Sequence, residues 1–300
     1  MSGMLPSSIF RLRRDGKHII DDVVNGLAFG SLLFVLASGF TLALGLIKVV
    51  NIAHGAFYML GGYVTYTVVT QFGNFFLAIL VSGAVVCVLA MGLQKFVLHR
   101  FLAAPLRQVL FTFGVALIIA EVCRHIWGSY PILIDTPEWL QGAIEVGSVT
   151  LPKYRAFVIV VAAIIGVLLW FLIKRTKLGA VVRACIDDQE IARAMGIDVS
   201  RIFIIMFGIS GFLAGVAGAI GMPFIGAYQG VQFEVLTLTL LVVVIGGLGS
   251  VPGALLGSLL IGVIYTIGAG AFPEFSYFLL FGPMILVLIF RPTGLLGRRE

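Results

Sequence analysis

Charged side chains are scarce in this chain of 300 residues. Asp, Glu, Lys and Arg make up 11% of it, whereas hydrophobic residues make up 60% and the mean hydropathy is +1.11. Average soluble proteins carry roughly 25% charged residues. A chain with less than half that share cannot cover a globule in water with polar side chains. A soluble domain, a disordered chain and a nucleic-acid-binding domain are therefore excluded, and a lipid environment is indicated.

Residues suited to catalysis or metal binding are equally few. The three cysteines, Cys87, Cys123 and Cys185, have no metal-ligand spacing, and we interpret them as small buried hydrophobic residues. The sequence has no His-Glu-x-x-His, no Ser, His and Asp set, no paired carboxylates in its apolar stretches and no Gly-x-x-x-x-Gly-Lys-Ser/Thr phosphate loop. We therefore expect no enzyme activity, no cofactor and no metal in this chain.

Long apolar runs divide the chain into candidate membrane segments. A bilayer core about 30 Å thick requires about 20 apolar helical residues. The runs cover residues 26–47, 53–70, 75–98, 109–127, 154–173, 202–227, 235–245, 251–271 and 275–290, and the seventh is too short to cross alone. The predicted fold class is all-α, a polytopic transmembrane bundle with about eight to nine membrane segments. A basic N-terminal segment, residues 1–22, precedes a single transmembrane domain, residues 23–300.

The charges of two loops predict the orientation, since Lys and Arg accumulate on the cytoplasmic side. Residues 128–152 contain three acidic residues and no Lys or Arg, which places this loop outside. The stretch 174–201 is basic and is placed inside. The C-terminus also carries arginines, and four crossings after residue 201 would return it to the inside. The basic residues of the inner loop are Lys174, Arg175, Lys177, Arg183, Arg193 and Arg201.

The N-terminal third is harder to orient, because residues 11–17 and the loop with Arg100 and Arg107 are both basic. Three apolar segments lie between them, and an odd number of full crossings cannot join two cytoplasmic ends. Either one segment is re-entrant, or the N-terminus lies outside despite its charges. We favour the re-entrant segment, because polar residues and a glycine interrupt the apolar run at 48–55. Irregular backbone at membrane depth is tolerated where it is buried in protein or lines a wet cavity.

A second interruption follows another apolar run, at residues 246–253. Glycine-broken segments at matching places in two halves of a chain indicate an internal repeat with a transport path at its interface. The alternative is that both interruptions are ordinary helix ends with Gly and Pro turns. Glycines spaced four residues apart predict close helix contacts. The candidate path residues at the two interruptions are Asn51, His54, Gly55, Gly246, Gly247, Gly249 and Ser250.

The inner loop, residues 174–201, encodes a short helix. Asp187 is the predicted N-cap, Glu190 follows three residues later as in a capping box, and Gly196 suits a left-handed position after the last turn. Ile191 and Met195 form a small apolar face that no membrane core requires. A partner could bind this face, or the helix could fold back on the chain's own surface. The helix comprises Asp187, Asp188, Glu190, Ile191, Ala192, Arg193, Met195 and Gly196.

Few ionisable residues lie within the apolar segments, where charge is costly and usually functional. Glu121 lies three residues before Arg124, so it either forms a local ion pair or lines a path. His54 is more often a hydrogen-bonded structural residue than a proton carrier. Glu234 begins a short segment and can remain in outer water. This scarcity argues against a self-contained channel or ion-coupled carrier.

Five stretches resemble the membrane permease of branched-chain amino-acid ABC importers, of the LivH type. They are NIAHGAFYMLG at 51–61, GAVVRA at 179–184, DDQEIARAMGI at 187–197, GGLGSVPGA at 246–254 and RPTGLLG at 291–297. The resemblance covers residues 23–297 in the expected order and spacing. It is more specific for the family than for the transported solute.

The resemblance implies a multi-subunit importer in the bacterial inner membrane. The expected partners are a second homologous permease, two ABC ATPase subunits that bind the ATP, an extracytoplasmic solute-binding protein and membrane lipid, with no nucleic acid. The helix starting at Asp187 would be the coupling helix that docks on an ATPase. The implied cargo is a branched-chain amino acid, and urea, short amides, aromatic carboxylates or nucleosides remain alternatives.

Overall fold

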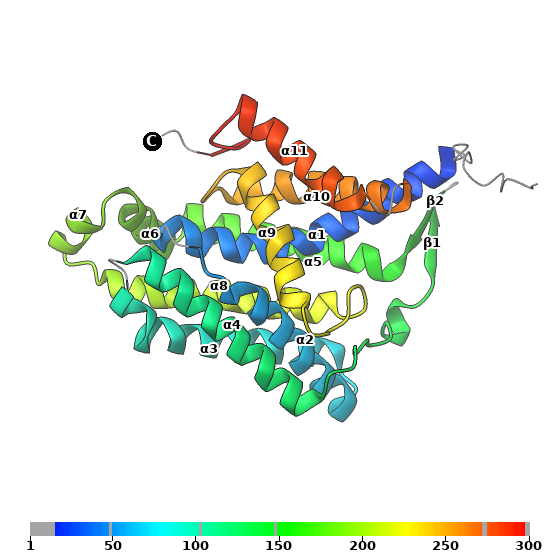
Figure 1. Ribbon diagram of the computed structural model, residues 1–300, viewed down its shortest axis with the longest axis horizontal. Helices are drawn as coiled ribbons and strands as arrows, with labels where there is room; N and C mark the ends of the chain where they lie inside the picture. Colours follow the sequence, from blue (N-terminus) through cyan, green and yellow to red (C-terminus); the bar gives the residue numbers. More distant parts are fainter. Residues whose placement is uncertain (1–15, 48–49, 102–103, 147–148, 272–274, 298–300) are drawn as a thin grey trace, which may run out of the picture.

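Every apolar run predicted above contains a helix in the computed structural model, which describes residues 16–47, 50–101, 104–146, 149–271 and 275–297 (Figure 1). Within these residues the α-helices are α1 (Gly16–Ile47), α2 (Ala53–Phe72), α3 (Phe75–Phe96), α4 (Pro105–Trp127), α5 (Lys153–Arg175), α6 (Lys177–Asp187), α7 (Gln189–Ala194), α8 (Val199–Gly221), α9 (Val231–Gly246), α10 (Val251–Ala271) and α11 (Ser276–Phe290). Two 3-10 turns, η1 (Leu98–Phe101) and η2 (Glu138–Leu140), and two strands, β1 (Ala143–Val146) and β2 (Val149–Pro152), complete them.

Six of these helices, α1, α3, α4, α5, α8 and α10, are long and apolar enough to cross a membrane. The apolar helices α9 and Phe278–Phe290 are shorter, and α2 is not among the candidate spans. The chain is therefore a multi-pass membrane protein that is mostly helical, as predicted. The total of eight to nine membrane segments stays a prediction. The predicted N-terminal segment, residues 1–22, falls partly on residues 1–15, which lie outside the described residues. Helix α1 begins within it, at Gly16.

Local side chains determine where several helices begin. Gly73, with φ of 65°, ends α2, and the Asn74 side chain then accepts a hydrogen bond from the Leu77 amide to start α3. Thr176 and Asp198 cap α6 and α8 in the same way. Such side-chain oxygens satisfy amide groups that have no partner inside the helix.

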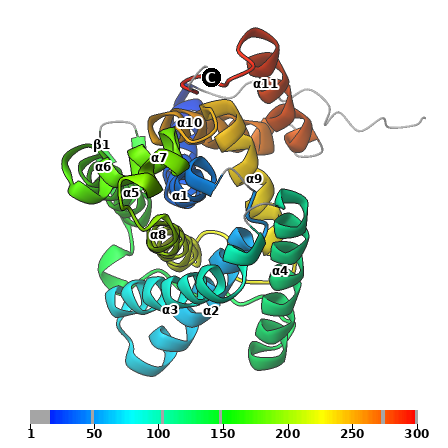
Figure 2. The ribbon, with the colours of Figure 1, turned by 90° about the vertical axis from the view of Figure 1, so that its left-hand side faces the viewer.

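Two long helix pairs form the centre of the bundle: α1 packs along α10, and α3 packs along α8. At both contacts the helices approach through glycines. A Cβ on Gly30 would lie 2.6 Å from the Ser258 carbonyl oxygen of α10, and one on Gly215 would lie 2.6 Å from the Ser82 carbonyl oxygen of α3. The prediction that the four-residue glycine spacing marks close helix contacts is confirmed. Helix α8 also contacts α1 and α2, so it lies in the middle of the molecule (Figure 2).

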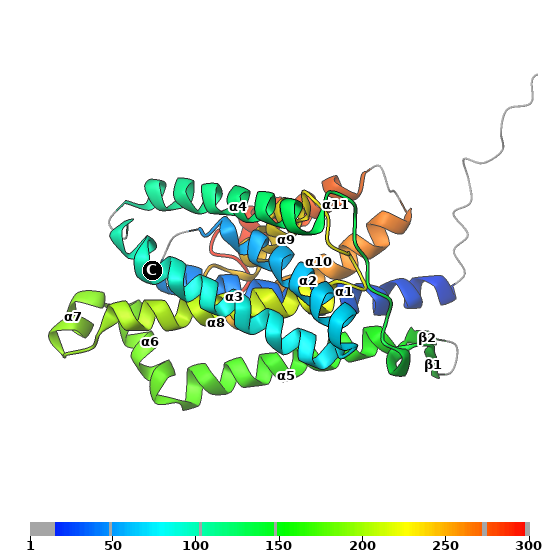
Figure 3. The ribbon, with the colours of Figure 1, turned by 90° about the horizontal axis from the view of Figure 1, so that it is seen from below.

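The bundle has two ends, which we call the hairpin end and the α7 end (Figures 1 and 3). Strands β1 and β2 form an antiparallel hairpin in which Ile144 pairs with Leu151. This hairpin was not predicted from the sequence. The segment before the hairpin packs on the start of α3, because Trp139 of η2 stacks on Phe76 with ring centroids 5.0 Å apart. Helices α6 and α7 lie at the opposite end, together with the α3–α4 connection and the C-terminal turn.

Helix α1 begins at the hairpin end, where the Thr150 amide of β2 donates to Asp21 Oδ1 over 3.4 Å. The chain then runs to the α7 end along α1, returns along α2 and runs back along α3 (Figure 3). Three segments therefore join opposite ends. Helix α1 therefore begins at the end opposite α7, which agrees with the alternative in which the N-terminus lies outside. Which of the three segments cross the membrane fully, and the side of the N-terminus, stay predictions.

Candidate functional site

Helix α7, which gives the α7 end of the bundle its name, is capped at its N-terminus and at its C-terminus. The Asp188 side chain accepts hydrogen bonds from the Glu190 and Ile191 amides over 2.8 and 3.0 Å. At the other end Gly196 has φ of 83°, its amide donates to the Arg193 carbonyl, and the Ile197 amide donates to the Ala192 carbonyl. This pair of bonds is a Schellman motif. The left-handed Gly196 was predicted correctly.

The predicted N-cap was wrong by one residue. Asp187 is the last residue of α6, and Asp188 adopts the extended conformation between the two helices. Glu190 then stands two residues after the cap and cannot close a capping box. The sequence does not distinguish the two aspartates, because only the end of α6 decides which of them has an extended backbone.

The apolar face of α7 points away from the bundle. Ile191 is 59% exposed and Met195 is 78% exposed, whereas Ala192 between them is buried against the chain. A pocket lined by Arg193, Phe203 and residues 197–200 lies where α7 connects to α8. Two exposed apolar side chains on a capped, ordered helix form a surface suited to a protein partner.

The first interruption lies where α2 starts, and α9 crosses it. A Cβ on Gly55 would lie 1.9 Å from the carbonyl oxygen of Gln232, in the first turn of α9. The Asn51 side-chain oxygen accepts from the Ala53 amide over 3.1 Å, and Thr112 of α4 accepts from the Ile52 amide over 3.2 Å. Within the described chain the Asn51 Nδ2 atom is buried without a hydrogen-bond partner. α1 and α2 are therefore separate helices, which agrees with a discontinuity and also with the alternative of ordinary helix ends.

His54, in the first turn of α2, links α2 to α1 and α8. It is fully buried, its Nε2 atom lies 3.0 Å from the Leu36 carbonyl of α1, and its Nδ1 atom lies 3.4 Å from Ser210 Oγ of α8. Because a carbonyl only accepts, Nε2 carries the proton and Nδ1 accepts from the serine. A neutral histidine that links three helices fits the structural role favoured by the sequence.

The second interruption connects α9 to α10. Ser250 Oγ accepts from the Gly253 amide over 3.1 Å and so caps α10, while Gly247 and Gly249 have φ of 103° and 76°. A Cβ on Gly249 would lie 3.2 Å from Gly45, close to the end of α1. The second interruption therefore packs against the last turn of α1. Gly246 packs against Gly253, so all four predicted residues belong to this turn.

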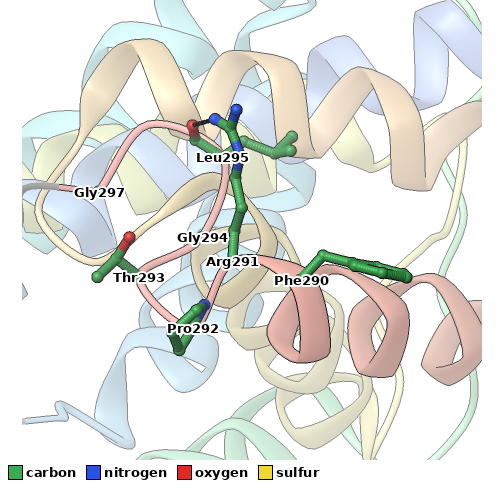
Figure 4. A pocket seen from close by; sticks show the side chains of 7 residues that line it. All are labelled: Phe290, Arg291, Pro292, Thr293, Gly294, Leu295 and Gly297. Atoms are coloured by element: carbon green, nitrogen blue, oxygen red, sulfur yellow. Dashed lines mark hydrogen bonds between the residues drawn. The ribbon is translucent and has the colours of Figure 1, made fainter.

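The C-terminal turn, residues 291–297, covers the end of α9. The Leu295 and Leu296 amides donate to the carbonyls of Ile245 and Gly246 over 2.8 and 3.0 Å. Arg291 folds over the turn and donates to the Leu295 carbonyl, and the turn surrounds a pocket (Figure 4). The sequence singled out RPTGLLG but not its role, which is to pair the last carbonyls of α9.

The remaining predicted path residue lies elsewhere. Glu121 is on the exposed face of α4 and pairs with Arg124, whose Nε atom lies 2.9 Å from its Oε2 atom. Glu121 does not join the residues of either interruption, so the alternative of a local ion pair is what the structure shows. Glu234, which the sequence left in outer water, instead accepts a hydrogen bond from the Tyr228 hydroxyl.

Comparison with known proteins gives a consistent set of similarities. The family described as "Branched-chain amino acid transport system / permease component" matches residues 23–288. The high-affinity branched-chain amino acid transport system permease protein BraD of Pseudomonas aeruginosa is 30% identical over 94% of this chain and 97% of its own length. LivH of Escherichia coli K12 is 27% identical over the same shares. The fructose import permease protein FrcC of Rhizobium meliloti is 33% identical over 44% of this chain and 39% of its own. No solved structure gives a significant match.

Proposed function

Because the chain belongs to the family of permease components of branched-chain amino acid transport systems, we propose that it is the membrane-spanning subunit of an ATP-driven importer in the bacterial inner membrane. The observation that carries this proposal is the exposed apolar face of α7, Ile191 and Met195, at one end of a membrane bundle. The proposed partner on this face is an ABC ATPase, so that the α7 end is cytoplasmic. The basic residues of the 174–201 stretch agree with that side.

The full importer contains a second homologous permease, two ATPases that bind and hydrolyse ATP, and an extracytoplasmic solute-binding protein that docks at the hairpin end. The permease itself binds no cofactor and catalyses no reaction. ATP-driven closure of the ATPases moves α7 of this chain and its counterpart. The two permeases then alternate between outward-open and inward-open states.

The translocation path runs beside the crossing of α2 and α9. Two short helices that begin inside a bundle are the arrangement that places polar backbone near a solute. The pattern of contacts between helices supports an inverted repeat that relates α1–α4 to α8–α11. Within each unit a long helix is followed by a short one, and the long helix packs on the third helix of the other unit: α1 on α10 and α8 on α3. The two long helices start at opposite ends of the bundle.

The cargo is a branched-chain amino acid or a related small polar solute. The partial similarity to a fructose import permease shows that related permeases are named for other cargo. Urea, short amides, aromatic carboxylates and nucleosides therefore remain alternatives with the same machinery. A self-contained channel or ion-coupled carrier is the alternative from another class.

The test is to purify the tagged chain from native membranes in mild detergent, identify the proteins that accompany it and measure ATPase activity against a panel of solutes. We expect two ATPases and a second permease, with ATPase activity stimulated by one solute together with its binding protein. Recovery of the chain alone, active in liposomes without ATP, would replace the importer with the channel or carrier.

A further inference from the structure

Glu234 occupies an unusual place for an acidic residue. It lies in the first turn of α9, and α9 begins inside the bundle, because the neighbouring Gln232 carbonyl touches Gly55 at the start of α2. The next residue before Gly55 is His54, which bonds to Leu36, near the middle of the apolar part of α1, Ile20–Gly45. Glu234 therefore lies in the turn that crosses the start of α2, and within a membrane bundle an ionisable side chain at such a place is costly and usually functional.

The Glu234 carboxylate has no positive partner among the described residues. Glu121 and Asp198, by contrast, each form an ion pair with an arginine three residues further along the chain. The half-buried Glu234 instead accepts from the Tyr228 hydroxyl, on the connection between α8 and α9. A tyrosine donor stabilises a carboxylate through one hydrogen bond but does not neutralise it.

A second hydroxyl lies on α2, on the face that packs against the α8–α9 connection. Tyr58 of α2 is 2% exposed, and its Oη atom has no hydrogen-bond partner in the part of the chain that the structure describes. It packs against Gly221 at the end of α8, and Gly62, one turn further along the same face of α2, packs against Ala227, the residue before Tyr228. The nearby Tyr154, by contrast, donates to the Ile220 carbonyl over 2.7 Å. A buried hydroxyl without a partner in the described chain is uncommon, and its oxygen can accept a hydrogen bond from a bound group.

We propose that Glu234, Tyr228 and Tyr58 form the site in the translocation path that receives the ammonium group of the solute. This inference rests on the proposed function. A primary ammonium has three N–H donors and one positive charge. The carboxylate supplies the opposite charge, and the two phenolic oxygens can accept the remaining donors. The three residues come from α2, α9 and the α8–α9 connection, so a change in the crossing of α2 and α9 opens or closes the site.

Such a site limits the range of solutes that the importer can carry. A site with a single carboxylate and no basic partner selects a solute with a free amino group, such as a zwitterionic amino acid, and gives no advantage to urea, amides, aromatic carboxylates or nucleosides. Because a carboxylate and hydroxyl oxygens also suit a monovalent metal ion, the experiment must separate the two ligands.

The test uses the whole importer, purified with its partner subunits and reconstituted in proteoliposomes with leucine-loaded binding protein. Glu234→Gln keeps the shape and removes the charge. We expect ATP-dependent leucine uptake to fall about tenfold to a hundredfold, as for loss of a hydrogen bond to a charged group. Stimulation of ATPase activity by the loaded binding protein should persist, because α7 is untouched. Tyr58→Phe should lower uptake by a smaller factor, and Glu234→Asp should restore part of it.

Glu121→Gln is the matched control, because it removes an exposed carboxylate outside the site, and its uptake should equal that of the wild type. Uptake at the wild-type rate by the Glu234→Gln importer would overturn the proposal. Equal loss of uptake and of ATPase stimulation would also overturn it, because that result indicates a structural role for Glu234. The proposal is also overturned if the wild-type importer carries only solutes without an amino group, or if its leucine uptake requires sodium bound at Glu234. Either result leaves the proposed importer function standing. Absence of any ATP-dependent uptake by the wild type instead contradicts the proposed function.

Discussion

The carbonyl oxygen of Gln232 lies so close to the α-carbon of Gly55 that a Cβ on the glycine would fall 1.9 Å from it. This contact joins the first turns of α2 and α9, the two short helices that begin inside the bundle. No side chain larger than hydrogen fits there unless the helices separate. The crossing of the two helices therefore depends on this one glycine.

Replacement of Gly55 by alanine should destabilise the protein by about 1–3 kcal/mol or more, because the added methyl group overpacks two backbones. The measurement is thermal denaturation in mild detergent, followed by size-exclusion chromatography. Gly114→Ala on α4 is the control, since open space surrounds it, and its effect should stay within about 1 kcal/mol. Equal melting of the Gly55 variant and the wild type would contradict the close crossing.

A charge on the exposed face of α7 should separate the chain from its ATPases. Ile191→Asp and Met195→Asp change side chains that are mostly exposed, so the chain should remain folded in the membrane. Co-purification of the ATPases and ATP-dependent uptake should both be lost. Gln141→Asp, an exposed position at the hairpin end, should leave both unchanged. Normal uptake in the α7 variants would refute the coupling assignment.

The caps of α7 allow a graded test. Asp188→Ala removes the acceptor of two amide hydrogen bonds and should destabilise α7 by about 0.5–2 kcal/mol. Asp188→Asn should preserve the cap, since asparagine is an equally good N-cap. Hydrogen exchange of residues 189–195 should quicken in the first variant only. The same exchange in all three proteins would show that the cap contributes nothing.

Single cysteines can test which residues share a side of the membrane. Ile20→Cys and Ile144→Cys should react with an impermeant thiol reagent from the same side, and Met195→Cys from the other. All three positions are exposed. The native Cys123 and Cys185 are buried, and burial raises the pKa of the Cys185 thiol, so that it reacts slowly. Labelling of positions 20 and 144 from opposite sides would disprove the described path of α1.

The C-terminal turn should be required for stability. Deletion of residues 291–300 leaves the Ile245 and Gly246 carbonyls without their donors, and each lost hydrogen bond costs about 0.5–1.5 kcal/mol. Deletion of residues 298–300 keeps these donors and serves as the control. The melting temperature should fall in the longer deletion only. Unchanged melting of both would mean that water replaces the turn.

Several features of this protein follow from the amino-acid sequence alone. The scarcity of charge and the spacing of apolar runs determine a helical membrane protein, since only lipid tolerates such a surface and only intrahelical hydrogen bonds satisfy the backbone there. The glycine spacings locate the close helix contacts, and the polar interruptions locate the starts of α2 and α10. The helix after residue 187 and its left-handed Gly196 are local features, so local sequence suffices to predict them.

Other features exist only through contacts between distant segments. The end of the bundle at which α1 begins, the meeting of Gly45 with Gly249 and the pairing of the C-terminal turn with α9 depend on packing across more than 40 residues of chain. The same holds for Glu234, whose sequence context suggests solvent but whose helix begins beside Gly55. The polarity of a residue predicts its cost at membrane depth, whereas its depth is determined by the helices that surround it.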